Sequence, residues 1–470
     1  PITRLFQSDS MTDSELEFVL SIIHVLLKYS WCQPGALSNE LFIQYVTLIT
    51  FLIGGKPGQF SMKTHSDDTV MNGVLCLQVL LQGCLNQDST FTSRVLENSK
   101  FVPTLGFLVS TLLNIAVESQ ISAMKAHSLK TLNILFHLID NGEILSLFFP
   151  GSVSSIAKIV TSRPHSNVLS EAFVTLTTLV SSIFSDFDLE VDAESKFNSL
   201  DSLRDSIEDS PKENLDFPIN TDLQPNSSLV ITIPESATSL KQHRTTSWLR
   251  STLNQFGKAL EIILKVDLKR YDKFNIRDAI FQFDVKIIRS SFLSCYPLIP
   301  MLLRSLSAIC FADPTFIPLT IESLVYIPEN ELLKLLLKKA LEDELHKMQY
   351  NFSSPDATKA ELMIQFIDLL IKILNGMNGI DASMLEKTLS RLQENIALLL
   401  EVKSTSDSKK KVHASNKQAL SMERKLLLVS SHYDKSTYDG LQKTPIFNGI
   451  ITKETETALE NLFETISENI

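Results

Sequence analysis

Glycine and proline are scarce in this sequence, with 14 and 17 among 470 residues, and the apolar stretches between them are long. Many short strands joined by tight turns need more of these residues, so an all-β fold is disfavoured and helices are favoured. Cysteine is sparse as well. An odd number of cysteines in a long chain argues for reduced thiols in the cytosol or nucleus rather than a disulfide framework: Cys32, Cys76, Cys84, Cys295 and Cys310.

The sequence also lacks an excess of basic residues and an apolar run long enough to cross a membrane. Its net charge is −11 and its pI is near 5.4, whereas nucleic-acid binders need clustered Lys and Arg to displace counterions from phosphates. The apolar stretches 16–27 and 41–53 are too short to cross a membrane. We therefore expect protein partners, with no nucleic acid and no membrane, and a location in the cytoplasm, with the nucleus as an additional location. Because the chain opens at Pro1 without an initiator Met, we expect it to be part of a longer reading frame.

Catalytic and cofactor motifs are missing too. The glycine-rich segment 54–58 lacks the spacing of a phosphate loop and a preceding strand, so we interpret it as a turn that ends a helix. There is no His-Glu-x-x-His helix, Gly-x-Ser-x-Gly elbow or kinase signature. The nine histidines are scattered, and His127 and His137 have no Cys or carboxylate cluster at metal-ligand spacing nearby. The prediction is a protein that is not an enzyme, with no cofactor, no metal and no catalytic residue.

Apolar residues recur at helical spacing almost everywhere. Thr12 and Glu15 have the spacing of a capping box ahead of the first such stretch. Asn275 is the expected N-cap of a helix that carries Ile276, Ile280 and Arg277. Helices are predicted from residue 12 onward and at about 38–53, 67–85, 102–118, 121–139, 153–160, 167–184, 247–265, 275–292, 299–311, 316–325, 330–346, 356–375, 381–401, 419–431 and 453–466.

Two of the predicted helices resemble each other. The segments that begin at Ser128 and Ala172 share Thr, Leu and Leu at matching positions, 44 residues apart. This offset lies within the period of about 40–47 residues of HEAT and armadillo repeats, whose helical pairs bury their apolar faces by stacking on neighbours. The expected fold is therefore all-α, a HEAT/armadillo-like α-solenoid of antiparallel helical pairs.

Two stretches interrupt the helical pattern. Residues 186–246 are rich in Asp, Glu, Ser, Asn and Pro, which predicts an acidic disordered insertion with candidate phosphorylation sites at Ser206 and Ser210. Its β-prone segment 229–233 is interpreted as an apolar part of a linker, with strand addition to a partner as the alternative. The second stretch, 404–418, is a polar basic connector, for which nuclear import is the alternative. The expected organisation is a solenoid segment (1–185), the insertion (186–246), a second solenoid segment (247–403), the connector (404–418) and C-terminal helices (419–470) that we expect to be truncated.

Specific residues resemble a known family. The segments that carry the resemblance are 106–116, 126–132 and Leu147-Phe-Phe-Pro-Gly-Ser-Val-Ser-Ser-Ile-Ala-Lys-Ile-Val160, followed by Thr246-Ser-Trp-Leu249, Ala259-Leu260, Ile276-Arg277 and 298–303. Together they resemble the Tel-two-interacting protein one family, in which a Phe-Leu-Pro-Gly segment enters a helix. Phe149 replaces the Leu of that segment here. The resemblance covers roughly a quarter of the chain and marks structural anchors at Phe149, Pro150, Gly151, Trp248 and Arg277.

The resemblance implies a HEAT-repeat scaffold subunit of the Triple-T (TTT) cochaperone complex. Its implied partners are a Tel-two-type HEAT protein, a second Tel-two-interacting protein and a chaperone adaptor complex that works with the ninety-kilodalton heat-shock chaperone. The implied clients are phosphatidylinositol-3-kinase-related kinases, whose maturation, assembly and stability the complex supports. Composition alone equally allows a nuclear-transport or other HEAT-repeat adaptor, and a membrane-coat scaffold is a third alternative. Such roles need an extended binding surface rather than catalytic groups.

Overall fold

A computed structural model describes residues 12–33, 36–55, 65–87, 101–189, 244–265, 274–327, 330–353, 357–380, 388, 390–391 and 461–462. Most of the predicted insertion, the connector 404–418 and the segment 229–233 lie outside these residues, as do Ser206, Ser210, the predicted helix 419–431 and nearly all of the helices 381–401 and 453–466. The chain divides into two compact units, Pro1–Ile299 and Pro300–Ile470. All regular structure in the described part is helical, which confirms the predicted all-α repeat fold.

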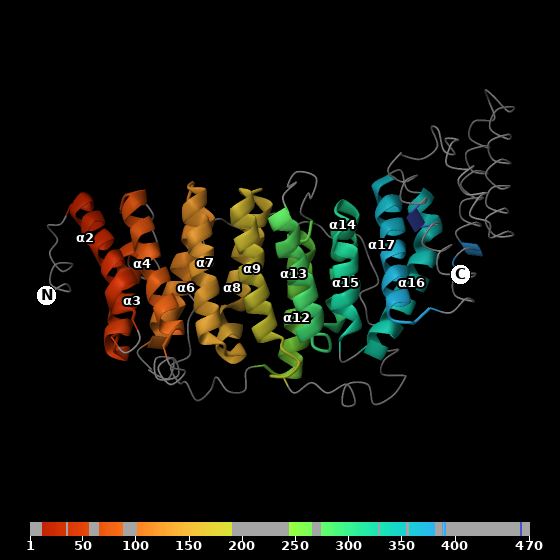
Figure 1. The fold of residues 1–470 in the computed structure, drawn as a ribbon, viewed down its shortest axis with the longest axis horizontal. Helices are drawn as coiled ribbons and strands as arrows, with labels where there is room; N and C mark the ends of the chain where they lie inside the picture. The colour runs from red at the N-terminus through yellow and green to blue at the C-terminus, as the bar shows by residue number, and fades with distance from the viewer. Residues whose placement is uncertain are drawn as a thin grey trace, which may run out of the picture. The chain divides into compact units, whose positions relative to one another are not determined.

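The first unit contains nine α-helices and two short turns of other helix types in its described part. The helices stand side by side in chain order, from red to green (Figure 1). They are α2 (Asp13–Leu26), continued by the π-helical turn η1 (Leu27–Trp31), then α3 (Asn39–Gly54), α4 (Asp67–Leu85), α6 (Phe101–Glu118), α7 (Ser122–Ile139), α8 (Gly142–Thr161), α9 (Ser166–Ile183), α12 (Thr246–Ile263), α13 (Phe274–Ser290) and the 3-10 turn η4 (Tyr296–Leu298).

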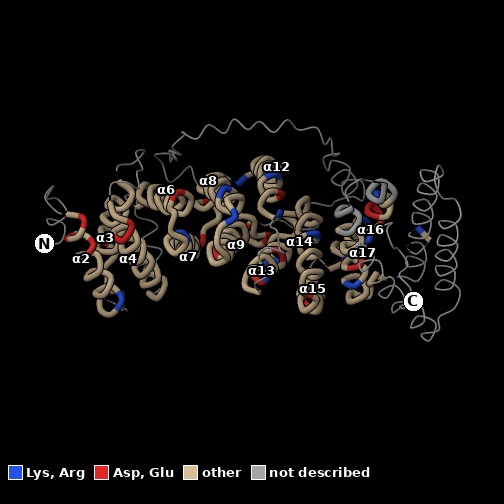
Figure 2. The backbone as a smooth tube through the Cα atoms, turned by 90° about the horizontal axis from the view of Figure 1, so that it is seen from above, with Lys and Arg blue, Asp and Glu red and all other residues tan. Residues whose placement is uncertain are grey.

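These helices form two layers. In one layer α3 contacts α6, α6 contacts α8 and α8 contacts α12, while in the other α2, α4, α7, α9 and α13 contact one another in that order. The pairs α3–α4, α6–α7 and α8–α9 join the layers. Figure 2 shows α6, α8 and α12 in one row, with α7, α9 and α13 in the other. Helices α7 and α9 begin 44 residues apart, at Ser122 and Ser166, so the repeat offset seen in the sequence relates neighbours within one layer.

Side chains that accept hydrogen bonds from free backbone N–H groups explain where several helices begin. Thr12 and Glu15 form the predicted capping box at α2. Ser38, Ser66 and Thr245 cap α3, α4 and α12 in the same way, each accepting a bond from the backbone N–H three residues later. These short polar side chains therefore define the residues at which the helices begin.

Helix α8 corrects the prediction of a shorter helix at 153–160. It starts at Gly142, so Pro150 and Gly151 lie inside the helix rather than before it. A proline inside a helix removes a backbone hydrogen bond and costs about 3 kcal/mol. Here Leu145, Phe148 and Phe149 before the proline share one buried face with the apolar residues after it, and this burial offsets the cost. The prediction for Asn275 was also wrong, because α13 already begins at Phe274 and Asn275 lies within its first turn.

Two helices of the first unit, α4 and α8, are long and apolar enough to cross a membrane by length and composition alone. More than half of each is buried within the protein. Each also has neighbours in its own layer and in the other layer, since α4 contacts α2, α3 and α7, and α8 contacts α6, α9 and α12. Their apolar character is therefore accounted for by their central position in a layered core.

The second unit contains most of α14 (Ile299–Ala312), then α15 (Phe316–Val325), α16 (Asn330–Ser353) and α17 (Ala357–Gly376). Helix α17 contacts both α15 and α16. Arg304 of α14 forms an ion pair with the buried carboxylate of Glu344 on α16, and its guanidinium lies over the ring of Phe366 at 5.5 Å. Cys310 and Thr320 are within hydrogen-bond distance of each other at 3.3 Å, which links α14 to α15.

Candidate protein-interaction surfaces

Four aromatic side chains meet where α8, α9 and α12 come together. The ring of Phe149 packs edge-on against Phe184 and Phe256, with centroids 5.3 and 5.2 Å apart. Phe184, the residue that ends α9, stacks on both Phe256 and Trp248 at 6.1 Å. Edge-on and stacked arrangements are the favoured geometries for aromatic pairs. We refer to these four residues as the aromatic junction.

The aromatic junction places two of the sequence-predicted anchors in one cluster. Phe149 and Trp248 lie on different helices that are separated in sequence by the insertion, and Phe184 and Phe256 connect them. Phe149, Phe184 and Phe256 are almost fully buried, while Trp248 is partly exposed at the edge. The two connecting residues were not predicted from the sequence. Phe256 could have been found, because it follows Trp248 by two helical turns and so lies on the same face of α12.

The other predicted anchors have different surroundings. Pro150 lies in the middle of α8, and a Cβ atom added to Gly151 would meet no atom within 4 Å. Arg277 is half-buried in the first turn of α13. Among the predicted anchors, therefore, Phe149 and Trp248 make the ring contacts of the junction, and Gly151 has room for a larger side chain.

Asp186 and Arg244, which lie on either side of the segment 190–243, both form hydrogen bonds to the helical framework. The Arg244 side chain donates from Nε to Glu143 Oε1 at 2.9 Å and from Nη1 to the Ile183 carbonyl at the end of α9, at 2.8 Å. The Asp186 carboxylate accepts bonds from the backbone N–H groups of Leu293 and Ser294, at 2.8 and 2.7 Å. Both residues belong to the range predicted as an insertion, yet each is bonded to the helical framework. No local sequence signal identifies these contacts, because the partners lie between 61 and 108 residues away in the chain.

Polar side chains connect neighbouring helices in the layer that contains α4, α7 and α9. His127 of α7 donates from Nδ1 to Gln78 Oε1 of α4 at 3.0 Å. On the other side of α7, the Thr178 hydroxyl of α9 donates to Asn133 Oδ1 at 2.7 Å and lies 3.3 Å from His137 Nε2. Burial lowers the pKa of both histidines, and the nearby Lys130 and Lys286 lower the pKa of His127 and His137, respectively, in the same direction. Both imidazoles are therefore predominantly neutral near pH 7 and act as hydrogen-bonding links.

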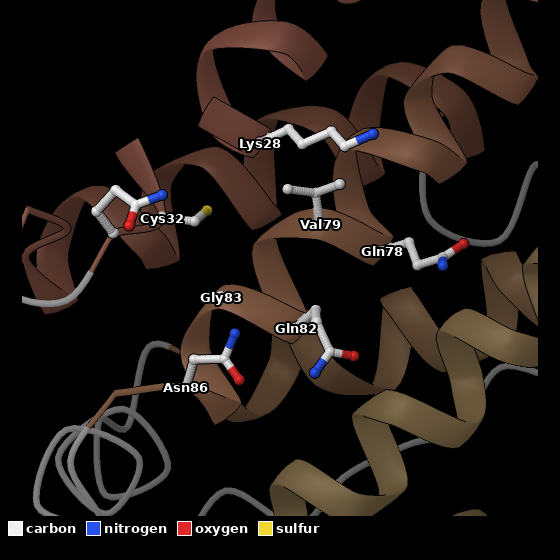
Figure 3. A pocket seen from close by; sticks show the side chains of 8 residues that line it. Lys28, Cys32, Gln78, Val79, Gln82, Gly83 and Asn86 are labelled. Atoms are coloured by element: carbon white, nitrogen blue, oxygen red, sulfur yellow. The ribbon is translucent and has the colours of Figure 1, made fainter. Parts of the chain in front are cut away.

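A cavity of about 380 Å³ opens between η1 and α4 (Figure 3). The π-helical turn is defined by the bond from the Cys32 N–H to the Leu27 carbonyl, and it carries Lys28. Gly83 allows η1 to approach α4 closely, because a Cβ atom at this position would lie 2.5 Å from Cys32 Cβ. The polar lining consists of Lys28, Gln33, Gln78, Gln82 and Asn86.

The described residues contain no group of three or more His, Cys, Asp or Glu side chains arranged to hold a metal ion. None of the five cysteines takes part in a disulfide within this part of the chain. Burial raises the pKa of the Cys76 thiol to about 12, and this thiol donates to the Leu20 carbonyl at 3.3 Å. A thiol with so high a pKa is protonated at neutral pH and is a packing group rather than a nucleophile.

Comparison with known proteins identifies the family to which this chain is related. The family model described as the TTI1 N-terminal TPR domain matches residues 1–311. TEL2-interacting protein 1 of Saccharomyces cerevisiae is 32% identical over 277 residues, which cover 57% of this chain and 25% of that protein. The chain thus spans about a quarter of the length of this relative. TPR and HEAT repeats are both stacked pairs of antiparallel helices, as in the first unit. The chain therefore belongs to the TTI1 family.

Proposed function

We propose that this chain is the repeat scaffold of a non-enzymatic subunit of the TTT cochaperone complex, which supports maturation, assembly and stability of phosphatidylinositol-3-kinase-related kinases. The observation that carries the proposal is the family membership: the family model covers the whole of the first unit, and the yeast relative is named for an interaction with TEL2. Its proposed partners are a Tel-two-type protein, a second Tel-two-interacting protein and a chaperone adaptor complex, in the cytoplasm and also in the nucleus.

The layered helices suit such a role physically. Each helix of the layer α2–α4–α7–α9–α13 has a solvent-facing side, so consecutive helices together offer an extended surface to a large partner. Interfaces of this kind distribute affinity over many modest contacts and need no reactive group. The elevated pKa of the Cys76 and Cys32 thiols and the neutral, hydrogen-bonded histidines fit a binding role.

Affinity purification of the full-length protein under native conditions tests the complex. We expect a Tel-two-type protein and a second Tel-two-interacting protein in amounts comparable to the bait, together with chaperone adaptor subunits. A small GTPase or transport cargo as the stoichiometric partner would instead favour the nuclear-transport adaptor.

Depletion of the protein tests the client class. A scaffold that stabilises folding and assembly intermediates should change the amount of client protein more than the amount of client messenger RNA. We therefore expect immunoblots to show reduced levels of phosphatidylinositol-3-kinase-related kinases at unchanged transcript levels. Re-expression of the full-length protein is the control and should restore them. Unchanged kinase levels after depletion would remove the cochaperone function and leave the repeat fold intact.

A further inference from the structure

The cavity between η1 and α4 contains a row of side-chain amides. Gln78 and Gln82 lie on α4 and Asn86 is the residue that ends it, so the three follow one another at four-residue spacing, and Figure 3 shows them along the same cavity. The Gln78 carbonyl accepts the bond from His127, which fixes the amide and leaves its two N–H donors directed elsewhere. The side-chain amides of Gln82 and Asn86 make no hydrogen bond within the part of the chain that the structure describes. The row therefore offers both donors and acceptors to a ligand.

The spacing of this row matches an extended peptide. Residues four apart on a helix are separated by about 6 Å along the axis. Residues two apart on an extended chain are separated by about 6.6 Å, and their main-chain groups point the same way. A side-chain amide can donate and accept at once, as a peptide group does. Three amides in this row can therefore bond to alternate main-chain groups of about five extended residues.

The charge of the residues that line the cavity determines which peptides would bind there. Among the residues that the structure describes, Lys28 is the one ionised residue that lines the cavity, and none of the lining residues is a carboxylate. Its ammonium lies 5.3 Å from the centroid of the Tyr29 ring. Lys28 belongs to the π-helical turn, a local distortion of a helix that is frequent at functional sites. Beside these polar groups, Val79 and the half-buried Cys32 provide an apolar wall, and burial raises the pKa of the Cys32 thiol to about 11. The cavity has the composition of a binding site rather than a reactive one.

We propose that the cavity between η1 and α4 binds an extended acidic segment of a partner protein. Gln78, Gln82 and Asn86 bond to its main chain, and Lys28 pairs with one of its Asp or Glu side chains. The main-chain contacts supply affinity for any extended sequence, and the lysine supplies the preference for an acidic one. This inference goes beyond the proposed function, because it holds whichever proteins are the clients.

The test is a selection from a display library of random twelve-residue peptides on the full chain, with counter-selection on the double variant Gln82→Ala/Asn86→Ala. The enriched peptides are then synthesised, and their affinity is measured by fluorescence polarisation. We expect the enriched sequences to share an Asp or Glu. The double variant should bind them about tenfold more weakly, because two hydrogen bonds are lost. Lys28→Ala should weaken binding about two- to fivefold and reduce its dependence on salt.

Gln282→Ala is the matched control, since this exposed glutamine on α13 bonds only within its own helix. It should leave peptide affinity unchanged. Melting temperatures of all variants establish that the exposed substitutions preserve the fold. A peptide whose main-chain N–H groups are methylated at alternate positions should bind at least tenfold more weakly than its parent. Absence of any enriched peptide, enrichment of basic or purely apolar sequences, or equal binding to the double variant would overturn the proposal.

Discussion

The aromatic junction and the η1–α4 contact join neighbouring helices with opposite kinds of residue. At the junction, three buried phenylalanine rings fill the space between α8, α9 and α12. At η1, the contact is made by Gly83 and Cys32, and a cavity with polar walls remains beside it. Large rings close a junction and exclude solvent, whereas a glycine allows two backbones to meet while leaving open volume next to them. The first arrangement favours stability, and the second provides a place for a ligand.

The largest expected effect is at the junction. Phe256→Ala removes a fully buried ring that contacts two other rings, and it should lower the free energy of unfolding by about 3–5 kcal/mol. The midpoint of urea denaturation measures this loss. Phe187→Ala is the control, because the Phe187 side chain is 91% exposed and its removal should change stability by less than about 0.5 kcal/mol. Equal effects of the two variants would contradict the role assigned to the junction.

Arg244 should have the second largest effect. Arg244→Ala removes the bonds to Glu143 and to the Ile183 carbonyl, and it leaves the partly buried Glu143 carboxylate without its cation. Hydrogen bonds of charged groups contribute about 1.5–3 kcal/mol, so we expect a destabilisation of that size in chemical denaturation. The control is Arg250→Ala at an exposed position on α12. If both variants have wild-type stability, the contacts of Arg244 do not hold this end of α9.

Two glycines distinguish tight packing from open packing. Gly83→Ala places a methyl group 2.5 Å from Cys32 Cβ, so η1 must shift, and we expect a loss of about 1–3 kcal/mol together with weaker binding of acidic peptides. Gly151→Ala adds a methyl group where no atom lies within 4 Å, and alanine favours a helix interior over glycine by about 0.5–1 kcal/mol. Thermal unfolding should therefore show opposite signs for the two substitutions. The same sign for both would contradict the described packing.

The smallest expected effect is on pH dependence. The pKa values of His127 and His137 are lower in the folded state than the ordinary value of 6.5, so the unfolded chain binds more protons just below that pH. Their contribution to stability is fully present above pH 6.5 and is lost as the pH falls through and below this value. Denaturation midpoints measured between pH 7.5 and 5.5 should decline toward acid. The double substitution to Gln should flatten the decline, and an unchanged slope would exclude these two histidines as its source.

The sequence predicted the helices better than it predicted their contacts. Helix α4 has the predicted bounds, and the capping box at Thr12 is present, because both depend on residues close together in the chain. The start of α8 was mispredicted, since local reasoning about Pro150 could not include the tertiary burial of Phe148 and Phe149. Long-range packing determines this helix more than local propensity does.

The candidate sites were harder to predict from the sequence than the helices. The amides at 78, 82 and 86 form a visible four-residue pattern on one helix face, but nothing in the sequence indicates that Lys28 lies across the cavity from them. Arg244 is an ordinary basic residue at the end of an acidic segment, and its two partners precede it by 101 and 61 residues in the chain. Such contacts depend on the stacking of the layers, which one sequence does not reveal.

The hydrogen bonds of Asp186 and Arg244 to the helical framework bear on how much the length of the chain between them can change. Arg244 bonds to the carbonyl of Ile183, three residues before Asp186, so the chain leaves and rejoins the helical framework at nearly the same place. The sequence predicts an insertion between these two points, and the entropy of closing a flexible insertion grows slowly with length, by about 0.6 kcal/mol for each doubling. We therefore expect this insertion to tolerate lengthening, shortening or replacement by a reporter domain at little cost to the stability of the solenoid. This position is suited to carrying a fluorescent protein in the native chain.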